Sequence, residues 1–497
     1  MTRTSLLGAS VAILLLAAAL RLPGLDDQSL WTDEIYSADS AHWPLPVLLS
    51  VADGHPPLYG LVLKALDRVR DSDANGRLVS AVAGIATVAA MLALGCAIAD
   101  RRTAVLAALL LAIAPLHVWY SREGRMYALV AACSVTASWL FVRALRDGGT
   151  AAWIGYAIVT AIGLLTHYLY GAVVLAQAAF IALRRFRDRI GSRGLALAGG
   201  GLLALLALAL PLLGRDVATV GHQRAFEWLA VPYTAYTFIG GFGLGPPVET
   251  LHRQRGLATI ATAYWPELAA VVLVGCAVCW AAVRGAGALR EWGEYLVLWI
   301  VVPALVIFGG AWLKDAAYNV RYLFGTFPAF VLLAAAGIAR APRRYAVACL
   351  AGLVLLAAVS IGRDRLDPRY AREDLRGAAR YLRENAGAGA PVTVSAHYVI
   401  EGLAHYAAPP RLEPLPIHPV ESAADADAVL ATLASSGGWL VLSRDWEDDP
   451  AGHLDRALAA RGAGAEVARF PGVRIFRFGD GQPAPSGSRE LSRTRAP

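Results

Sequence analysis

The sequence predicts a polytopic α-helical membrane protein of about eleven spans, with a small extracytoplasmic α/β domain at its C-terminal end. Of its 497 residues, 57% are hydrophobic and 17% are charged, whereas soluble proteins carry about a quarter charged residues. Many apolar runs are long enough to cross a hydrocarbon layer, and beyond residue 362 the pattern changes to amphipathic helices and short strands. These observations exclude an ordinary soluble globule.

The charge balance fits a membrane protein. Lysine and arginine number 45 against 38 acidic residues, which gives a formal net charge of +7. A small positive excess in such a chain is typical of cytoplasmic loops, so no nucleic-acid partner is expected. The basic residues are almost all arginine, and Ala and Gly are abundant, as in proteins from GC-rich bacterial genomes. The cysteines lie in apolar runs, so neither a disulfide framework nor a zinc site is expected.

Apolar runs of about 16 to 22 residues are the candidate spans. The first is expected to be a retained anchor, because no clean A-x-A cleavage site follows it. The runs lie near 5–20, 78–99, 104–119, 126–142, 152–166, 169–183, 195–213, 267–283, 293–312, 322–339 and 345–362.

The orientation follows from arginine in the short loops. With the N-terminus inside, the arginine-bearing loops between successive spans are cytoplasmic, as the positive-inside rule requires. The chain is then a multi-pass protein of the bacterial cytoplasmic membrane, with a transmembrane domain over 1–362. Its long outer loops are 21–77 and 214–266, the α/β domain over 363–480 faces outward, and the tail 481–497 is expected to be disordered.

The first outer loop contains two apolar segments that are too short to span, 41–52 and 56–66. Such segments are either interfacial helices at the headgroup level or core helices of a folded loop. In the C-terminal region, helices are predicted at 370–386, 423–435 and 450–462. Strands are predicted at 391–397, 438–443, 466–470 and 473–478, with Pro471-Gly472 as a hairpin turn.

Asp33 and Glu34 are adjacent carboxylates just outside the first span. A carboxylate near a low-dielectric region tends to have a raised pKa, which suits a general base. Two adjacent acids also suit a divalent cation, although the sequence does not require one. The alternative is a helix N-terminal pair, because Thr-Asp-Glu after Trp31 is favourable capping chemistry.

Basic and imidazole side chains recur at the same predicted membrane face, where ionisable residues are functional candidates by default. Arginine binds phosphate through a bidentate fork, although arginines at a membrane boundary also extend to lipid headgroups. A carboxylate base together with several cations indicates a reaction in which a nucleophile is deprotonated and an anionic group is stabilised. Phosphate is the anion that lipids supply. The cations are His55, Lys64, Arg122, Arg125 and Arg321, flanked by Tyr59, His167, Tyr168 and Tyr322 as expected substrate contacts.

Five motifs in order carry a family resemblance. The segments LWTDEIYSADSA, HPPLYGLVLKAL, SREGRMYAL, THY and RYLFGTFPAFVLL resemble those of the GT-C membrane glycosyltransferases. More narrowly, the chain is similar to the bacterial relatives of protein O-mannosyltransferases and lipid A aminoarabinose transferases. The segment DPRYAREDLRGAARYLRENAG after the last span fits the same group, and the resemblance covers about residues 20 to 410.

The resemblance implies transfer of a sugar from a polyprenyl-phosphate donor to an acceptor on the outer face of the membrane. Asp33 matches the family's base and Glu34 its neighbour, while His55 falls where the family often contacts donor phosphate. Arg122, Arg125 and Arg321 match basic positions on the phosphate or acceptor side. The first loop has no D-x-D metal motif, so neither a metal nor another cofactor is expected. The reaction is expected to be inverting. No Glu-Lys precedes Pro56, which counts against aminoarabinose.

The expected partners are the lipid-linked donor, membrane lipids and an acceptor glycan, lipid or protein of the cell envelope. The sugar stays open among mannose, arabinofuranose, galacturonic acid and aminoarabinose. A flippase for a polyprenyl-linked glycan and a non-catalytic envelope scaffold are the alternatives, but transporters usually place charges near the bilayer midplane. The second outer loop contains four side chains that either contact the sugar or are ordinary polar residues of a loop. They are His222, Arg224, Glu227 and Trp228.

Overall fold

The structure is a computed structural model that describes residues 2–50, 55–184, 226–253, 256–387, 389–406, 411–461 and 464–479. The chain forms two compact units. The helical unit comprises Met1–Leu25, Ser40–Leu244 and Pro266–Ile361, and the sheet unit comprises Asp26–Asp39, Gly245–Trp265 and Gly362–Pro497. The predicted span 195–213, the candidates His222 and Arg224, and the tail 481–497 lie outside the described residues.

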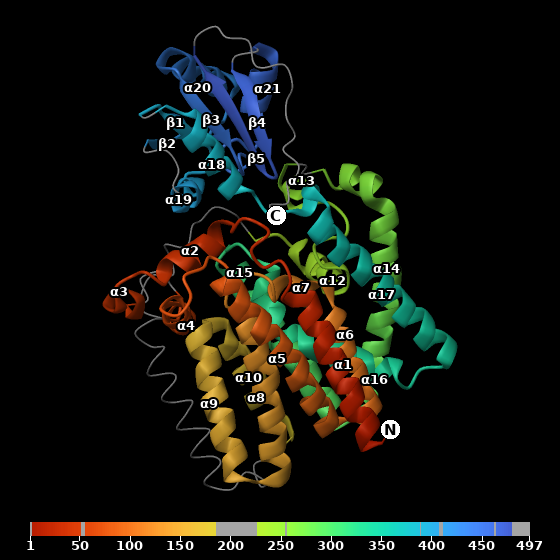
Figure 1. The fold of residues 1–497 in the computed structure, drawn as a ribbon. Coiled ribbons are helices and arrows are strands. Elements are labelled where there is room, and N and C mark those ends of the chain that lie inside the picture. The colour runs from red at the N-terminus through yellow and green to blue at the C-terminus, as the bar shows by residue number, and fades with distance from the viewer. Residues whose placement is uncertain are drawn as a thin grey trace. The chain divides into compact units, whose positions relative to one another are not determined.

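The helical unit confirms the predicted polytopic membrane fold (Figure 1). Seven helices in the described residues are long and apolar enough to cross a membrane, and α9 and α10 are shorter apolar helices. The unit contains α1 Arg3–Arg21, α3 Leu45–Leu49, α4 Leu58–Asp67, α5 Asn75–Ile98, α6 Arg101–Ile113, α7 Pro115–Tyr120, α8 Tyr127–Asp147, α9 Thr150–Thr166, η1 Tyr168–Tyr170, α10 Gly171–Arg184, α12 Ala230–Gly240, α15 Glu291–Leu313, η4 Val320–Thr326 and α16 Phe327–Ile338. Helices α14 Leu257–Ala288 and α17 Arg343–Leu366 run from one unit into the other.

The predicted span 104–119 is two helices. Helix α6 ends at Ile113 and α7 begins at Pro115. Proline has no backbone N–H to donate within a helix, and it is favoured at the first helical position. The break therefore follows from Pro115. In the first outer loop, the two short apolar segments form α3 and α4.

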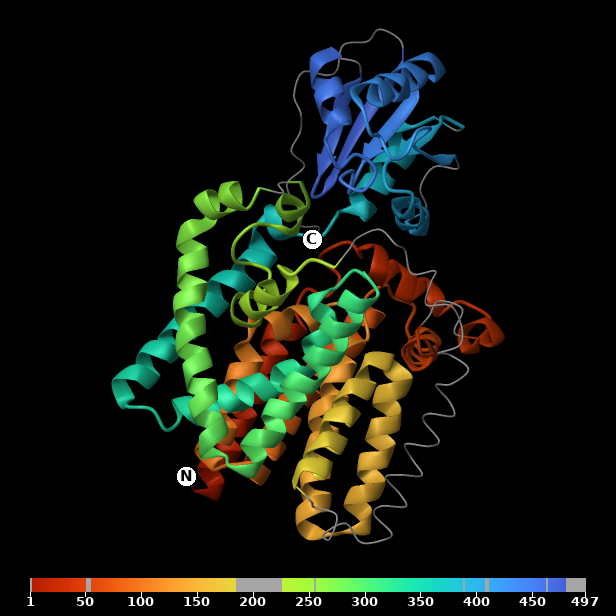
Figure 2. The same ribbon diagram turned by 180° about the vertical axis from the view of Figure 1, so that it is seen from behind.

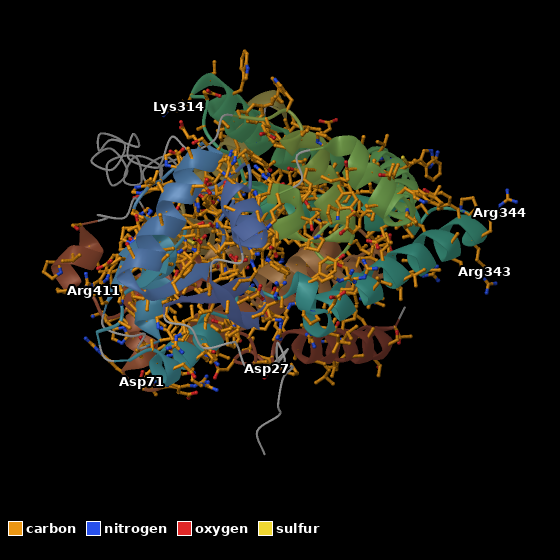
Figure 3. All side chains as sticks on the ribbon, turned by 90° about the horizontal axis from the view of Figure 1, so that it is seen from above. Asp27, Asp71, Lys314, Arg343, Arg344 and Arg411 are labelled. Carbon is orange, nitrogen blue, oxygen red and sulfur yellow. The ribbon has the colours of Figure 1, made fainter. Side chains whose placement is uncertain are left out.

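Arginine-bearing turns gather at one end of the helical unit. The Arg146 guanidinium at the end of α8 donates to the carbonyl of Ala97 at the end of α5. Arg340, just after α16, contacts Asp100 in the α5–α6 turn at 3.0 Å. The N-terminus and the α8–α9 and α16–α17 turns lie at this same end (Figures 1 and 2), and Figure 3 shows Arg343 and Arg344 extending away from the ribbon where α17 begins. Three of the segments predicted to be inner loops, the α5–α6, α8–α9 and α16–α17 turns, thus share one end.

Small residues allow close helix packing in the helical unit, as is common between membrane helices. A Cβ on Gly337 of α16 would lie 1.8 Å from the carbonyl oxygen of Ala281 in α14. A Cβ on Gly285 of α14 would lie 1.9 Å from the carbonyl oxygen of Leu333 in α16. Both distances are far below any possible contact. Glycine at these two positions therefore permits the approach of α14 and α16.

The sheet unit has a five-stranded sheet in the order β2-β1-β3-β5-β4. Strand β1 pairs in parallel with β2 and β3, whereas β5 is antiparallel to β3 and β4. The predicted strands and the Pro471-Gly472 hairpin are confirmed, and β2 and α19 are additional elements. The elements are β1 Val392–Val394, β2 Leu412–Pro414, β3 Gly438–Leu442, β4 Ala465–Phe470, β5 Val473–Phe478, α18 Leu375–Asn385, α19 Tyr398–His405, α20 Ala423–Ser436 and α21 His453–Arg461.

Helices cover both faces of this sheet (Figure 1). Strand β3 alternates accordingly, since successive side chains of a strand point to opposite faces. Trp439 and Val441 pack with α18 and α19, while Leu440 and Leu442 pack with α20 and α21. Two segments from earlier in the chain complete the unit, the start of α2 Thr32–Ser40 and α13 Val248–Arg253.

Candidate functional site

A cavity opens in the helical unit where α8, η1 and η4 begin. It encloses about 330 Å³ of space, part of it open to solvent. Helix α8 begins at Tyr127, His167 accepts a hydrogen bond from the Leu169 N–H at the start of η1, and Asn319 accepts one from the Arg321 N–H at the start of η4. The lining combines polar side chains with apolar walls, namely Tyr127, Val130, His167, Leu169, Tyr170, Val173, Pro303, Arg321, Tyr322, Gly325 and Thr326.

Four of the predicted site residues come together at this cavity, and we call His55, Arg125, His167 and Arg321 the cationic cluster. Arg125 Nη2 lies 3.1 Å from His55 Nε2. The His55 and His167 rings are 6.1 Å apart. The Arg321 guanidinium lies 5.6 Å from the centre of the Tyr127 ring, which is itself 5.8 Å from the His167 ring. Residues from four segments distant in sequence therefore share one site.

The contacts of the cluster define the state of its histidines. A guanidinium can only donate hydrogen bonds, so His55 Nε2 must accept from Arg125 and the ring hydrogen is on Nδ1. His167 lies in the turn between α9 and η1 and is buried. Burial is the largest cause that lowers the pKa of His167 to about 3, and the electrostatic influence of His55, Arg125 and Arg321 adds to it. His167 is therefore uncharged at neutral pH, and the nearby guanidiniums of Arg125 and Arg321 supply the positive charge at the cavity.

Three other predicted residues contact backbone carbonyls instead. Lys64 Nζ donates to the carbonyls of Ala41 and Trp43 at 2.9 and 2.8 Å. Arg122 donates to three carbonyls at the end of α1. The Tyr59 hydroxyl donates to a carbonyl in α5 at 3.2 Å. These contacts fix loops of the helical unit, and the binding roles of the three residues stay predictions.

Of the two tyrosines predicted to contact substrate beside His167 and Arg321, one lines the cavity and the other does not. Tyr322 lines the cavity and lies 5.9 Å from the Arg321 guanidinium. Tyr168 is in η1 beside His167 but is not part of the lining. In the second outer loop, Trp228 is 65% exposed and its ring lies 6.2 Å from that of Trp312.

Asp33 and Glu34 belong to the sheet unit. Helix α2 begins at Thr32, which places both acids in its first turn, where the helix dipole favours negative charge. Glu34 is buried, and its carboxylate lies 2.6 Å from Arg372 Nη1. Asp33 stays partly exposed. The two neighbours thus differ in burial, because Glu34 is buried in an ion pair and Asp33 is partly exposed.

Arg372 and Arg444 were not predicted as site residues. Arg444 Nε lies 2.6 Å from Glu373, and its guanidinium lies 5.2 Å from the centre of the Trp31 ring. Burial alone would raise the pKa of Glu373, but the Arg444 guanidinium outweighs it and the pKa is lowered. A signal for Arg372 is present in the sequence, because it lies within DPRYARED, a segment that contributes to the family resemblance.

Within the described residues, no group of three or more His, Cys, Asp or Glu side chains is arranged to hold a metal ion. The expectation of a reaction without a metal stays a prediction. It is tested by assay in a chelator.

Comparisons with known proteins agree with the resemblance in the motifs. The family model described as dolichyl-phosphate-mannose-protein mannosyltransferase matches residues 54–213. No curated protein sequence matches the chain.

Solved structures match the chain over nearly its full length. The structure of ArnT from Cupriavidus metallidurans in the apo state has a TM-score of 0.53 at 14% identity, covering 95% of this chain and 98% of that one. The same protein bound to undecaprenyl phosphate gives 0.52 at 14% identity, covering 96% and 98%. Archaeoglobus fulgidus AglB, an archaeal oligosaccharyltransferase in complex with an inhibitory peptide and a dolichol-phosphate, gives 0.51 at 13% identity, covering 89% and 70%. The predicted GT-C membrane fold is confirmed.

Proposed function

We propose that this chain, which shares the fold of ArnT and AglB, is an inverting glycosyltransferase. It moves a sugar from a polyprenyl-phosphate-linked donor to an acceptor hydroxyl. The acceptor is a glycan, lipid or protein of the cell envelope, and the reaction takes place at the outer face of the cytoplasmic membrane.

The observation that carries this proposal is the cavity beside the cationic cluster. Arg321 and His167 line it together with apolar side chains such as Val130, Val173 and Pro303. A polyprenyl phosphate is an anion on a hydrocarbon chain, so a positive potential beside apolar helices matches both of its parts. The solved neighbours support this ligand class, because ArnT was solved with undecaprenyl phosphate and AglB with dolichol-phosphate.

The cationic cluster would stabilise the leaving group. The acceptor oxygen attacks the anomeric carbon, and the bond between that carbon and the phosphate oxygen breaks with its electrons on the phosphate. The phosphate thereby changes from a singly charged diester to a monoester that carries a second negative charge. Arg321 and Arg125 would act on this developing charge, and fixed cations at such a position lower the barrier.

Asp33 would accept the proton that the acceptor hydroxyl loses. It matches the family's base in the motif LWTDEIY, and it stays partly exposed in the first turn of α2. The carboxylate of its neighbour Glu34 forms an ion pair with Arg372, so Glu34 is the weaker candidate for the base. The proton moves to the Asp33 carboxylate as the new glycosidic bond forms, and no general acid is needed for a phosphate leaving group.

Transfer of a radiolabelled sugar by the purified protein tests the proposal. Mannosyl-, arabinofuranosyl- and galacturonosyl-phosphate polyprenols are offered separately with envelope extract as acceptor. With one of these donors we expect the radiolabel to appear in a glycosylated product and polyprenyl phosphate to be released. Translocation of the intact donor across a vesicle without cleavage would favour a flippase, and neither activity would favour a scaffold.

A reporter fusion tests the orientation. Eleven spans from an inner N-terminus predict that residues 363–480 face outward. A reporter that is active only outside the cytoplasm should therefore work when fused after Gly479, and the same reporter fused within 340–344 should not. Activity of a cytoplasm-only reporter after Gly479 would contradict the orientation.

A further inference from the structure

The sheet unit holds the start of helix α2 within its own core. Leu30 and Ile35 are each 1% exposed and pack with Leu375 of α18 and Leu403 of α19. The Leu30 N–H donates to the Tyr406 hydroxyl at 2.9 Å. Apolar burial and a hydrogen bond therefore fix the segment that leads into the Asp33 motif.

Two arginines hold Trp31 and Glu34, which lie two residues before and one residue after Asp33. Arg372 forms the 2.6 Å ion pair with Glu34, and Arg444 lies over the Trp31 ring. Their side chains are only 11% and 21% exposed. Ion pairs and cation–π contacts are stronger when desolvated, so both contacts restrict how α2 starts.

These contacts also determine how α2 is rotated about its axis. Successive residues of a helix point about 100° apart, so drawing Glu34 onto Arg372 directs Asp33 to another side. Asp33 remains partly exposed while Glu34 is buried. The direction of the candidate base is thus a consequence of where its neighbour is held.

Arg444 occupies a special position in the sheet. From β1 the chain passes to β2 on one side and then returns to β3 on the other. The carboxyl ends of strands at such a reversal commonly form the ligand crevice of α/β sheets. Arg444 follows β3 with a φ of +52°, a backbone conformation that residues other than glycine rarely adopt. At this edge its guanidinium meets Trp31 of the same chain.

We propose that Arg372 and Arg444 are positioning residues for Asp33, acting through Glu34 and Trp31. The sheet unit then serves catalysis by fixing the base. The inference rests on the proposed role of Asp33.

Glu34→Gln, Arg372→Gln and the double variant form the test, measured as kcat, donor KM and affinity for undecaprenyl phosphate. Each single change leaves one buried charge without its partner, whereas the double variant leaves none. We expect kcat to fall by up to about 10²-fold in each single variant, because small displacements of a catalytic group have effects of this size. Donor KM and lipid affinity should stay within about threefold, and the double variant should recover most of the lost kcat.

Arg474→Gln is the matched control. Arg474 is in the same unit, is 22% exposed and pairs with Asp455 at 2.5 Å, but its polar contacts are with Asp445 and Asp455 and not with α2. It should leave kcat unchanged at a temperature where the protein is folded.

The outcomes separate the two proposals. A wild-type protein without transferase activity contradicts the proposed function itself. An active wild type whose folded Arg372→Gln and Glu34→Gln variants keep kcat within twofold overturns the positioning role, and so does an equal loss in Arg474→Gln. If Arg372→Gln does not fold, Glu34→Gln carries the test alone, because it preserves the shape of the side chain and removes only its charge.

Discussion

The two groups of candidate residues are built differently. In the helical unit, Arg125 contacts the His55 imidazole and Arg321 lies over the Tyr127 ring. In the sheet unit, Arg372 lies 2.6 Å from a carboxylate, that of Glu34. An ion pair reduces the field that its arginine exerts at a distance.

Burial is the largest cause of the lowered pKa of His167, and the nearby charges of Arg125 and Arg321 add to it. Their positive potential therefore reaches the cavity. Such a potential binds an anion. The ion-paired arginine of the sheet unit suits a different task, which is to hold a helix in place. We therefore expect the first group to bind the anion and the second to position helix α2, and a separate variant tests each expectation.

The largest effect is expected for Asp33→Asn. The change preserves shape and hydrogen bonding but removes proton acceptance, and general-base contributions are about 10²- to 10⁴-fold. kcat should fall by at least the lower figure. Affinity for undecaprenyl phosphate should be unchanged, since a carboxylate is not needed to bind an anion. Separate measurements of lipid binding and single-turnover transfer check this, and near-normal turnover would remove Asp33 as the base.

Arg321 is expected to have the next largest effect, on binding. Hydrogen bonds to charged groups contribute about 1.5–3 kcal/mol, so Arg321→Ala should weaken binding of undecaprenyl phosphate by about 10- to 100-fold. Arg321→Lys should recover only part, because an ammonium lacks the bidentate fork. Isothermal titration in detergent measures both variants. Unchanged affinity in Arg321→Ala would leave this arginine as a contact for lipid headgroups.

Local patterns predict much of this molecule, because apolar runs and strand alternation are local properties. They predict the membrane helices, the β4–β5 hairpin and the approximate face at which His55, Arg125 and Arg321 meet. They do not predict the Glu34–Arg372 pair, whose members are 338 residues apart in the sequence and are joined only by folding. Nor do they predict β2, since the three residues Leu412–Pro414 are too few for a periodic signal.

A moderate effect is expected on stability at acid pH. The pKa of His167 is about 3 in the folded protein and about 6.5 when unfolded, so below pH 6.5 the unfolded state binds a proton that the folded state does not. Stability is therefore lost as pH falls, by about 2 kcal/mol between pH 7 and 5. Thermal unfolding of wild type and His167→Gln at both pH values isolates this contribution. Equal pH dependence of the two proteins would contradict the depressed pKa.

The smallest effect on donor binding is expected for Lys64, although its motif resembles a donor site. Its ammonium donates to the carbonyls of Ala41 and Trp43, so Lys64→Met should leave these two acceptors without their donor. Such a loss destabilises by about 1–3 kcal/mol, while affinity for undecaprenyl phosphate should change by less than about threefold. Thermal unfolding and lipid titration of the same preparation distinguish the two roles, with Arg321→Ala as the control for lost binding. A tenfold weaker affinity at unchanged stability would place Lys64 with the cationic cluster, because a cation that binds phosphate affects the ligand more than the fold.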